Sequence, residues 1–545
     1  MTADLVVRAQ KVYTMDPAFP VAAGLAVQDG EIVAVARNAQ ELDEQTGPDT
    51  TILGGEDVVV LPAFIDTHNH LMLSAHNVLG VPISQAGDLG QLIGLIRERA
   101  AATPQGQWII TAADWHENRL AERRLPTAAE LDRATSEHPV LVLRGGHNGV
   151  LNSAGLRMAG IGPETPDLPG GFIARDAAGH PAGWVQDAAL DHARRALPPV
   201  PADDLAAALA QASARYASHG IGTVKDAAVS PAEWQAYREA RAAGRLSVRS
   251  HAMIWTTPAA VAAAGSSPGP GPGSGSMDAY LDGLEAQGIR PGEGDAVLRV
   301  WGLKLVLDGG VEAAALEQPY PARPGYHGEL LWDPGALTEA LTVAARRGWP
   351  VGTHAFGDRA VAVLLDAIGA VRQRAGRQGA ALVVEHGGLI GDRIGQARNL
   401  GVHVTVQQPL LDGLAHALIA EWGPERPAEL FPMRELLDAG VAISAGTDHP
   451  IGPLDPLRAI HGMITRQTPA GVLGPGHAIR RDEAFRLYTT AGAALLGSAG
   501  GRLARGAPPD LVAYPADPMT CDPAQLLSLV PAFTALEGRV THEGR

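Results

Sequence analysis

Histidine and acidic residues of this 545-residue chain stand at the ends of short apolar runs. The run FIDTHNH at residues 64–70 ends in two histidines that are two positions apart. Side chains with this spacing on an extended strand face the same side, so His68 and His70 can bind one metal ion together. The pair alone is weak evidence, because two histidines in a surface turn have the same spacing.

A lysine interrupts another apolar run, LRVWGLKLVLDG, at residues 298–309. Strand alternation predicts that Trp301 and the three leucines that alternate with it pack under helices, while Lys304 lies on the other face. An unpaired lysine in a buried strand costs several kcal/mol. Either a carboxylate pairs with Lys304, with Asp308 or Asp226 as candidates, or its amine reacts with CO₂ to form an anionic carbamate that can bridge two metal ions.

Three more runs end in residues that could bind metal. PVGTH ends at His354, ALVVEH ends at His386, and the strand in VAISAGTDHP leads to Asp448. Singly, each histidine could be a hydrogen-bonded core or rim residue, and Asp448 could be a helix N-cap. Together with the first two runs, however, five predicted strands carry such residues near their C-terminal ends, where barrel enzymes build active sites. Imidazole and carboxylate ligands suit zinc, manganese, iron or cobalt.

Short apolar runs alternate with helical stretches, which predicts an α/β fold with a parallel sheet. The candidate strands are 58–66, 139–144, 221–226, 247–254, 298–307, 350–355, 381–386, 402–407 and 441–447. These are nine strands, one more than the eight of a (β/α)₈ TIM-like barrel. The segment at about 75–205 is much longer than a usual strand-to-helix connection, so we assign 139–144 to an inserted subdomain after the first barrel strand.

Both ends of the chain contain predicted short strands joined by turns. Asp29-Gly30 between two apolar runs predicts a hairpin, and residues 510–514 and 532–540 predict strands near the C-terminus. Neither end can bury a core alone. We therefore expect a composite small β domain from 1–57 and 498–545, beside a barrel at 58–497.

Composition excludes several classes of protein. The net charge of −16 argues against a sequence-independent binder of nucleic acid or anionic membranes. We see no secretory signal and no apolar stretch of membrane-spanning length, and the single cysteine, Cys521, excludes an intrachain disulfide. These features predict a cytoplasmic protein. The Gly/Pro/Ser-rich run at 265–276 predicts a flexible loop between the third and fourth barrel strands, either a surface insertion or a lid.

The order and spacing of these motifs resemble the amidohydrolase superfamily over nearly the whole chain. The resemblance is closest to its large-insertion branch, which includes N-substituted formamide deformylases. The motifs that carry it are VYTMD at 12–16, DGEIVAV at 29–35, GH at 146–147 followed by NS at 152–153, GIGTV at 220–224 and HAFGDRA at 354–360.

This resemblance implies a site residue by residue, with one or two divalent metal ions, zinc first among them. The implied metal ligands are His68, His70, Lys304 as a bridging lysine, His354, His386 and Asp448. Two departures are notable: Ala63 stands where the superfamily usually has glycine, and Trp115-His116-Glu117 replaces its usual Gly-Trp-Asp. The second lies in the insertion and bears on the choice of substrate.

The expected function is hydrolysis of an amide-type C–N bond in a small molecule. A bound metal can lower the pKa of water from about 15.7 to about 7, which is worth roughly 12 kcal/mol. Asp448 would take a proton from this water and deliver one to the leaving group. His147, Asp308 and Trp115 are candidates to bind the substrate.

Two other classes of function stay open. A metal-dependent lyase or isomerase could use the same barrel, since a fold does not dictate a reaction. A non-catalytic binding protein is the other alternative, which the full ligand set argues against. The sequence is also compatible with a homo-oligomer.

Overall fold

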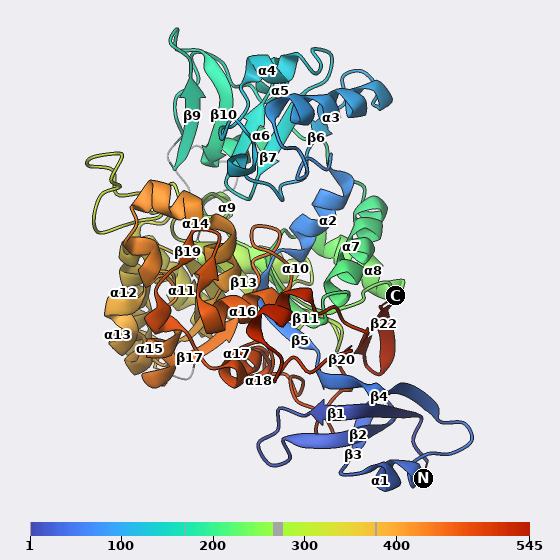
Figure 1. The fold of residues 1–545 in the computed structure, drawn as a ribbon. Coiled ribbons are helices and arrows are strands. Elements are labelled where there is room, and N and C mark those ends of the chain that lie inside the picture. The colour runs from blue at the N-terminus through green and yellow to red at the C-terminus, as the bar shows by residue number, and fades with distance from the viewer. Residues whose placement is uncertain (1, 169, 265–275, 377–378, 545) are drawn as a thin grey trace.

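The computed structural model describes residues 2–168, 170–264, 276–376 and 379–544. A barrel forms the middle of the molecule, with the inserted subdomain at one end and a sheet from both chain termini at the other (Figure 1). This arrangement confirms the predicted fold class. Of the predicted flexible loop at 265–276, residues 265–275 lie outside the described part of the chain.

The barrel is a sheet of eight parallel strands, and its strand order follows the chain. Near its closure, the Thr67 hydroxyl donates a hydrogen bond to the Ala445 carbonyl over 2.8 Å, and the Asp448 amide donates to the His68 carbonyl over 2.8 Å. A Cβ on Gly446 would lie 2.6 Å from the backbone of His68, so this approach requires glycine. The strands are β5 (Phe64–Asn69), β11 (Ile221–Val229), β12 (Arg249–Trp255), β13 (Leu298–Val306), β14 (Val351–Ala355), β15 (Leu382–His386), β16 (His403–Val406) and β17 (Ala442–Ala445).

Helices follow the barrel strands and surround them (Figure 1). In the described ranges, no helix is long and apolar enough to cross a lipid bilayer. The helices are α2 (Leu71–Leu79), α7 (Ala202–Ala217), α8 (Glu233–Ala242), α9 (Pro258–Ala263), α10 (Met277–Ala286), α11 (Pro334–Arg346), α12 (Asp358–Ala375), α13 (Ile394–Leu400), α14 (Gln408–Trp422), α15 (Met433–Asp438), α16 (Pro456–Thr465), α17 (Arg481–Leu487) and α18 (Thr490–Leu496).

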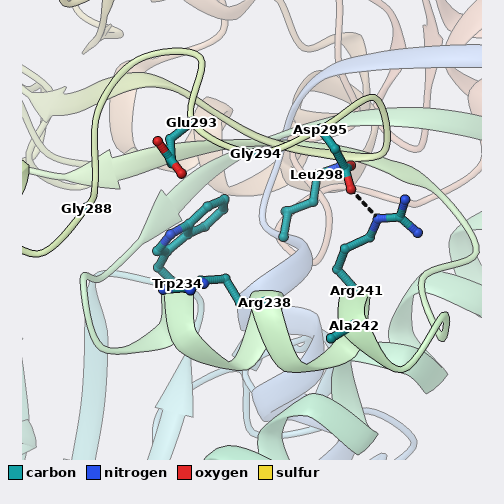
Figure 2. Close-up of a pocket in the computed structure, with 9 residues that line it drawn as sticks. All are labelled: Trp234, Arg238, Arg241, Ala242, Gly288, Glu293, Gly294, Asp295 and Leu298. Atoms are coloured by element: carbon teal, nitrogen blue, oxygen red, sulfur yellow. Dashed lines mark hydrogen bonds and ion pairs between the residues drawn. The ribbon is translucent and has the colours of Figure 1, made fainter.

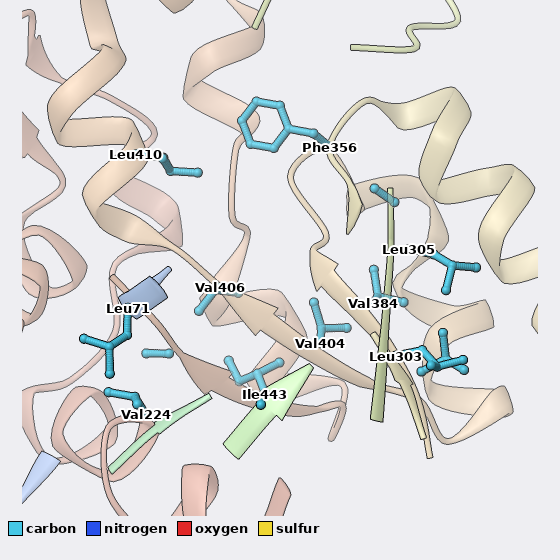
Figure 3. Close-up of a cluster of buried hydrophobic side chains, with 14 of the residues drawn as sticks. Leu71, Val224, Leu303, Leu305, Phe356, Val384, Val404, Val406, Leu410 and Ile443 are labelled. Carbon is cyan, nitrogen blue, oxygen red and sulfur yellow. The ribbon is translucent and has the colours of Figure 1, made fainter. Parts of the chain in front are cut away.

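The largest hydrophobic core joins barrel strands to these helices (Figure 3). Leu303, Leu305 and Val404 are fully buried in it, and burying one such side chain stabilises the fold by roughly 1.5–3 kcal/mol. The predicted place of Trp301 in this layer is wrong. The pairing of β12 with β13 shifts register at this position, and Trp301 packs instead with Met253 and other residues of a separate cluster. A β-bulge re-aims a side chain in this way, so Trp301 departs from the alternation that holds for the leucines.

The terminal sheet has seven strands, in the order β22-β21-β20-β4-β1-β2-β3. Asp29 and Gly30 both have positive φ (52° and 76°) between β2 and β3, which is the backbone of the predicted tight hairpin. The strands are β1 (Leu5–Tyr13), β2 (Val21–Gln28), β3 (Glu31–Ala36), β4 (Thr51–Pro62), β20 (Leu511–Tyr514), β21 (Phe533–Leu536) and β22 (Arg539–Glu543), and α1 (Ala39–Asp43) follows β3.

The single strand predicted at 58–66 divides into two. Its first part completes β4 in the terminal sheet, where Leu61 pairs with Val512 of β20. The chain then passes through Ala63, and β5 begins the barrel at Phe64. Local hydrophobicity could not reveal this division, because both parts are buried apolar strands.

The inserted subdomain has a five-stranded sheet of its own, in the order β6-β7-β8-β10-β9. The predicted extra strand, β7, lies in this sheet and not in the barrel, as expected. The subdomain contains α3 (Leu89–Ala102), β6 (Ile109–Ile110), α4 (Ala128–Asp132), β7 (Val140–Arg144), β8 (Asn148–Leu151), α5 (Ser153–Met158), β9 (Gly171–Arg175), β10 (Pro181–Asp187) and α6 (Ala188–Arg194).

Candidate metal centre

The residues predicted to bind metal come together at one end of the barrel. Imidazole and carboxylate atoms of His68, His386 and Asp448 all lie within 4.8 Å of one another. His70 Nε2 is 3.0 Å from Asp448 Oδ1. The His354 ring lies beside the His386 ring, with 4.4 Å between ring centroids. The strand ends thus gather histidine and carboxylate side chains that are up to 380 residues apart in sequence.

Lys304 also reaches this cluster, with its Nζ 3.3 Å from His68 Nε2. Burial lowers the pKa of Lys304 to about 8. In the described part of the chain, neither Asp226 nor Asp308 pairs with Lys304. Asp226 accepts hydrogen bonds from the Tyr237 hydroxyl and a backbone amide, while Asp308 accepts three backbone N–H bonds.

The cluster has the properties that a metal ion requires. His354 Nε2, His386 Nδ1 and Asp448 Oδ1 are buried and have no hydrogen-bond partner, which costs about 1–3 kcal/mol for each such polar group. Burial holds the pKa of His68, His354 and His386 well below the usual range, so these imidazoles are in the neutral form that binds metal. A metal ion would supply the missing partners.

The distances and the backbone agree with this interpretation. His68 Nε2 and His70 Nε2 lie 3.6 and 3.0 Å from Asp448 Oδ1, and ligands of a tetrahedral zinc ion are about 3.4 Å apart. His386 and Asp448 both have positive φ, 71° and 54°. Such strained residues cluster at functional sites, where the surrounding structure holds them in place.

A buried chain of polar residues binds His68 at its Nδ1 atom. The sequence did not predict this chain. Glu385 Oε2 accepts a hydrogen bond from His68 Nδ1 over 2.6 Å and another from the Thr405 hydroxyl over 2.7 Å. Its other oxygen forms an ion pair with Lys225, whose Nζ lies 4.7 Å from the centre of the Trp301 ring. Although burial opposes its charge, Lys225 and Lys304 lower the pKa of Glu385.

This chain fixes the role of His68. Because Nδ1 of His68 donates its hydrogen bond to Glu385, Nε2 carries no proton, and its lone pair can bind a metal ion. The reasoning that singled out Lys304, a lysine within an apolar run, applies equally to Lys225 in GIGTVKDA and could have found it.

Comparison with known proteins places the chain in a family. A family model described as "Amidohydrolase family" matches residues 56–542. This chain belongs to the amidohydrolase family. The match covers both the barrel and the inserted subdomain, so family membership extends to the whole site.

Two relatives of this amidohydrolase align over nearly their full length. The N-substituted formamide deformylase of Arthrobacter pascens is 28% identical over 559 residues, which cover 99% of this chain and 98% of the relative. The putative amidohydrolase YtcJ of Bacillus subtilis (strain 168) is 26% identical over 548 residues, with 98% of each chain covered.

A solved structure shares the fold. An uncharacterized metal-dependent hydrolase from Pyrococcus furiosus superposes with a TM-score of 0.72 at 24% identity, covering 95% of this chain and 100% of that one. A second such hydrolase, from Pyrococcus horikoshii OT3, has a TM-score of 0.74 at 22% identity and covers 95% of this chain and 99% of that one.

The three candidate substrate residues of this amidohydrolase occupy different places. The His147 ring lies 6.2 Å from the His354 ring, between centroids, at the edge of the metal cluster. Burial opposes its charge, but a hydrogen bond to Asp187 raises the pKa of His147. Asp308 Oδ1 is 3.5 Å from His354 Nε2, and burial raises the pKa of Asp308 to about 7.

Trp115 lies in the hydrophobic core of the inserted subdomain. Its indole N–H donates a hydrogen bond to the Leu143 carbonyl over 2.5 Å. These contacts explain Trp115 as a packing residue, and its substrate role stays a prediction.

The inserted subdomain is tied to the barrel by a buried cation. Arg144, at the end of β7, pairs with Glu117 of the same subdomain over 3.0 Å and with Glu312, in the loop after β13, over 2.7 Å. A group made of His116, Glu117 and Glu312 also has spacing that could hold a metal ion. Arg144 already neutralises much of its charge, so we assign this group to holding the subdomain over the barrel.

A hollow of about 320 Å³ lies elsewhere on the barrel (Figure 2). Trp234 and Arg241 of α8 line it, and Arg241 pairs with Asp295 over 2.8 Å. Leu298 lies in its wall at the beginning of β13, whereas Lys304 is six residues further along that strand, about 20 Å away. This hollow is therefore separate from the metal cluster.

Proposed function

We propose that this amidohydrolase is a metal-dependent hydrolase that cleaves an amide-type C–N bond of a small molecule. The observation that carries the proposal is the set of buried ligand atoms at the strand ends, three of which have no hydrogen-bond partner. Family membership and the deformylase relative support a C–N bond as the target.

The residues that would hold metal are the six that the sequence predicted. They are His68, His70, Lys304, His354, His386 and Asp448. Neutral imidazoles with a carboxylate favour zinc, while manganese, iron and cobalt also accept these ligands. A divalent metal bound there supplies an acidified water and polarises the scissile carbonyl.

Asp448 would carry the proton transfers. Its Oδ1 is buried without a hydrogen-bond partner among the histidines, where it would bind the metal ion, and the second oxygen of the carboxylate could accept a proton from the attacking water. The same carboxyl group then delivers this proton to the nitrogen of the leaving group. The carbon–nitrogen bond breaks, and a carboxylic acid and an amine are released for each water consumed.

Lys304 decides between one metal ion and two. Because burial lowers the pKa of Lys304 to about 8, about a tenth of its amine is neutral at pH 7. The neutral amine is the form that attacks CO₂, forming an N–C bond and releasing a proton to give an anionic carbamate. That group would bridge two metal ions, whereas an unmodified Lys304 would leave a one-metal site.

A substrate screen tests the function. N-formyl and N-acyl amines are incubated with zinc-loaded and manganese-loaded protein, and amine release is measured in H₂¹⁸O. We expect one amine per turnover and one ¹⁸O atom in the acid product. The metal-loaded Asp448→Asn variant serves as a control for contaminating hydrolases. Product formed without ¹⁸O incorporation would contradict hydrolysis and favour a lyase or isomerase.

A further inference from the structure

Two residues of the inserted subdomain, His147 and Asp187, form a pair at the edge of the barrel site. His147 directly precedes β8, and Asp187 ends β10, the neighbouring strand of that sheet. The Asp187 amide donates a hydrogen bond to the His147 carbonyl over 2.9 Å. The two side chains also pair, with 2.7 Å between His147 Nδ1 and Asp187 Oδ1. The pair is thus fixed through both backbone and side chains.

Asp187 adopts an unfavourable local structure. It stands at the N-cap of α6, where an aspartate usually accepts a hydrogen bond from the helix, yet its side chain makes no such bond. Its backbone has φ 47° and ψ −116°, a conformation that favours glycine. Its carboxylate instead binds His147. Asp187 thus makes no capping bond and has a strained backbone, and neither feature stabilises the local structure. This combination indicates a functional role for Asp187.

His147 is placed to meet a substrate. Its side chain is 31% exposed, whereas His68 of the metal cluster is fully buried. Because Nδ1 binds Asp187, Nε2 is the nitrogen left for another partner. The barrel loop after β13 borders the ring, since a Cβ on Gly310 would lie 3.7 Å from His147 Cδ2. The imidazole therefore lies between the inserted subdomain and the metal cluster.

We propose that Asp187 is a positioning residue that holds His147 so that its Nε2 forms a hydrogen bond with the amide group of the substrate. The substrate would then bind between the inserted subdomain and the barrel. This proposal rests on the proposed function, because it assumes an amide held at the metal cluster. It gives the insertion a part in catalysis beyond covering the barrel.

The Asp187→Gly variant tests the proposal. Glycine relieves the backbone strain and costs little at an N-cap, which offsets the loss of the bond to His147, so the melting temperature should stay close to that of the wild type. Metal content should be unchanged, and kcat/KM should fall about ten- to hundredfold, as expected for a lost hydrogen bond to a charged group. Asp191→Asn is the matched control, because Asp191 lies on the same helix and pairs only with Arg194 in the described structure.

A double-mutant cycle separates positioning from a structural role. On a His147→Ala background, Asp187→Gly should have no further effect on kcat/KM, because the residue that it positions is gone. Full additivity of the two effects would overturn the proposal. So would an Asp187→Gly enzyme with lower melting temperature and wild-type kcat/KM, because Asp187 would then only stabilise the subdomain.

A binding measurement keeps the test independent of turnover. Acetohydroxamate carries an amide-like carbonyl and binds metal centres, so its Kd for zinc-loaded protein is measured by calorimetry. We expect about tenfold weaker binding in Asp187→Gly. An unchanged Kd would overturn the proposal. A wild-type protein that binds this probe but hydrolyses no amide would contradict the proposed function alone, and a wild type that does not bind it would overturn both.

Discussion

The Glu385→Gln substitution should weaken metal binding through His68 while keeping the size of the side chain. Glu385 accepts hydrogen bonds from His68, Thr405 and Lys225, whereas a glutamine can present only one accepting oxygen. If its amide N–H₂ faces His68, the imidazole must move its proton to Nε2. That nitrogen then cannot bind a metal ion.

The size of the effect follows from these contacts. Loss of an outer partner of a metal-binding histidine typically costs 10–100-fold in metal affinity, or about 1.4–2.8 kcal/mol. Stability should fall as well, because breaking a buried ion pair costs about 3–5 kcal/mol. Burial already lowers the pKa of Lys225, so Lys225 can lose its proton in the variant. The loss of stability should therefore lie near the lower end of this range.

Zinc affinity is measured by competition with a chromophoric chelator, and stability by thermal unfolding of the metal-free forms. The double variant Lys225→Met/Glu385→Gln should regain stability but not zinc affinity, since it removes the unpaired lysine without restoring the acceptor for His68. Glu233→Gln is the matched control, because Glu233 also pairs with a histidine, His76, over 2.7 Å but outside the barrel site. A folded Glu385→Gln variant with the zinc affinity of the wild type would refute the reasoning.

Three other substitutions have distinct expected results. Asp448→Asn should retain metal and lose at least about 100-fold in kcat with a much smaller change in KM, and near-normal kcat in the metal-loaded variant would remove Asp448 from the mechanism. Lys304→Ala should lose metal and activity, and short carboxylates such as formate should partly restore both; full metal content without Lys304 would contradict its role as a ligand. Gly446→Ala should reduce the free energy of unfolding by about 1–3 kcal/mol in denaturant titrations, because its Cβ would lie 2.6 Å from the His68 backbone. In contrast, Gly283→Ala in helix α10 meets no atom within 4 Å and should be stabilising, so equal losses in the two variants would contradict the packing argument.

The sequence predicted much of this site, because strand ends can be identified locally. A histidine or aspartate that ends an apolar run must lie at the C-terminal end of a barrel strand, wherever that strand stands in the barrel. His68, His354, His386 and Asp448 were therefore placed on the right face without knowledge of any contact. The assignment of 139–144 to the insertion also depended on local features of the sequence, namely loop length and turn residues.

What the sequence could not predict depends on contacts between distant segments. Glu385 was visible as part of ALVVEH, but its bond to His68 joins strands that are 317 residues apart. Asp187 meets His147 only because β8 and β10 are neighbours in the inserted sheet. The bulge at Trp301 arises from the pairing of β12 with β13 and has no local signal in the run of alternating residues.

Metal content measured together with activity tests the central claim most directly. The purified protein is analysed for metal, dialysed against a chelator, and then reloaded with zinc or manganese, with amine release from an N-acyl amine measured at each stage. The arrangement of His68, His70, His386 and Asp448 predicts at least about one divalent metal ion per chain, with activity that disappears on chelation and returns on reloading. Protein that is metal-free and fully active would contradict the claim that these residues form a metal centre.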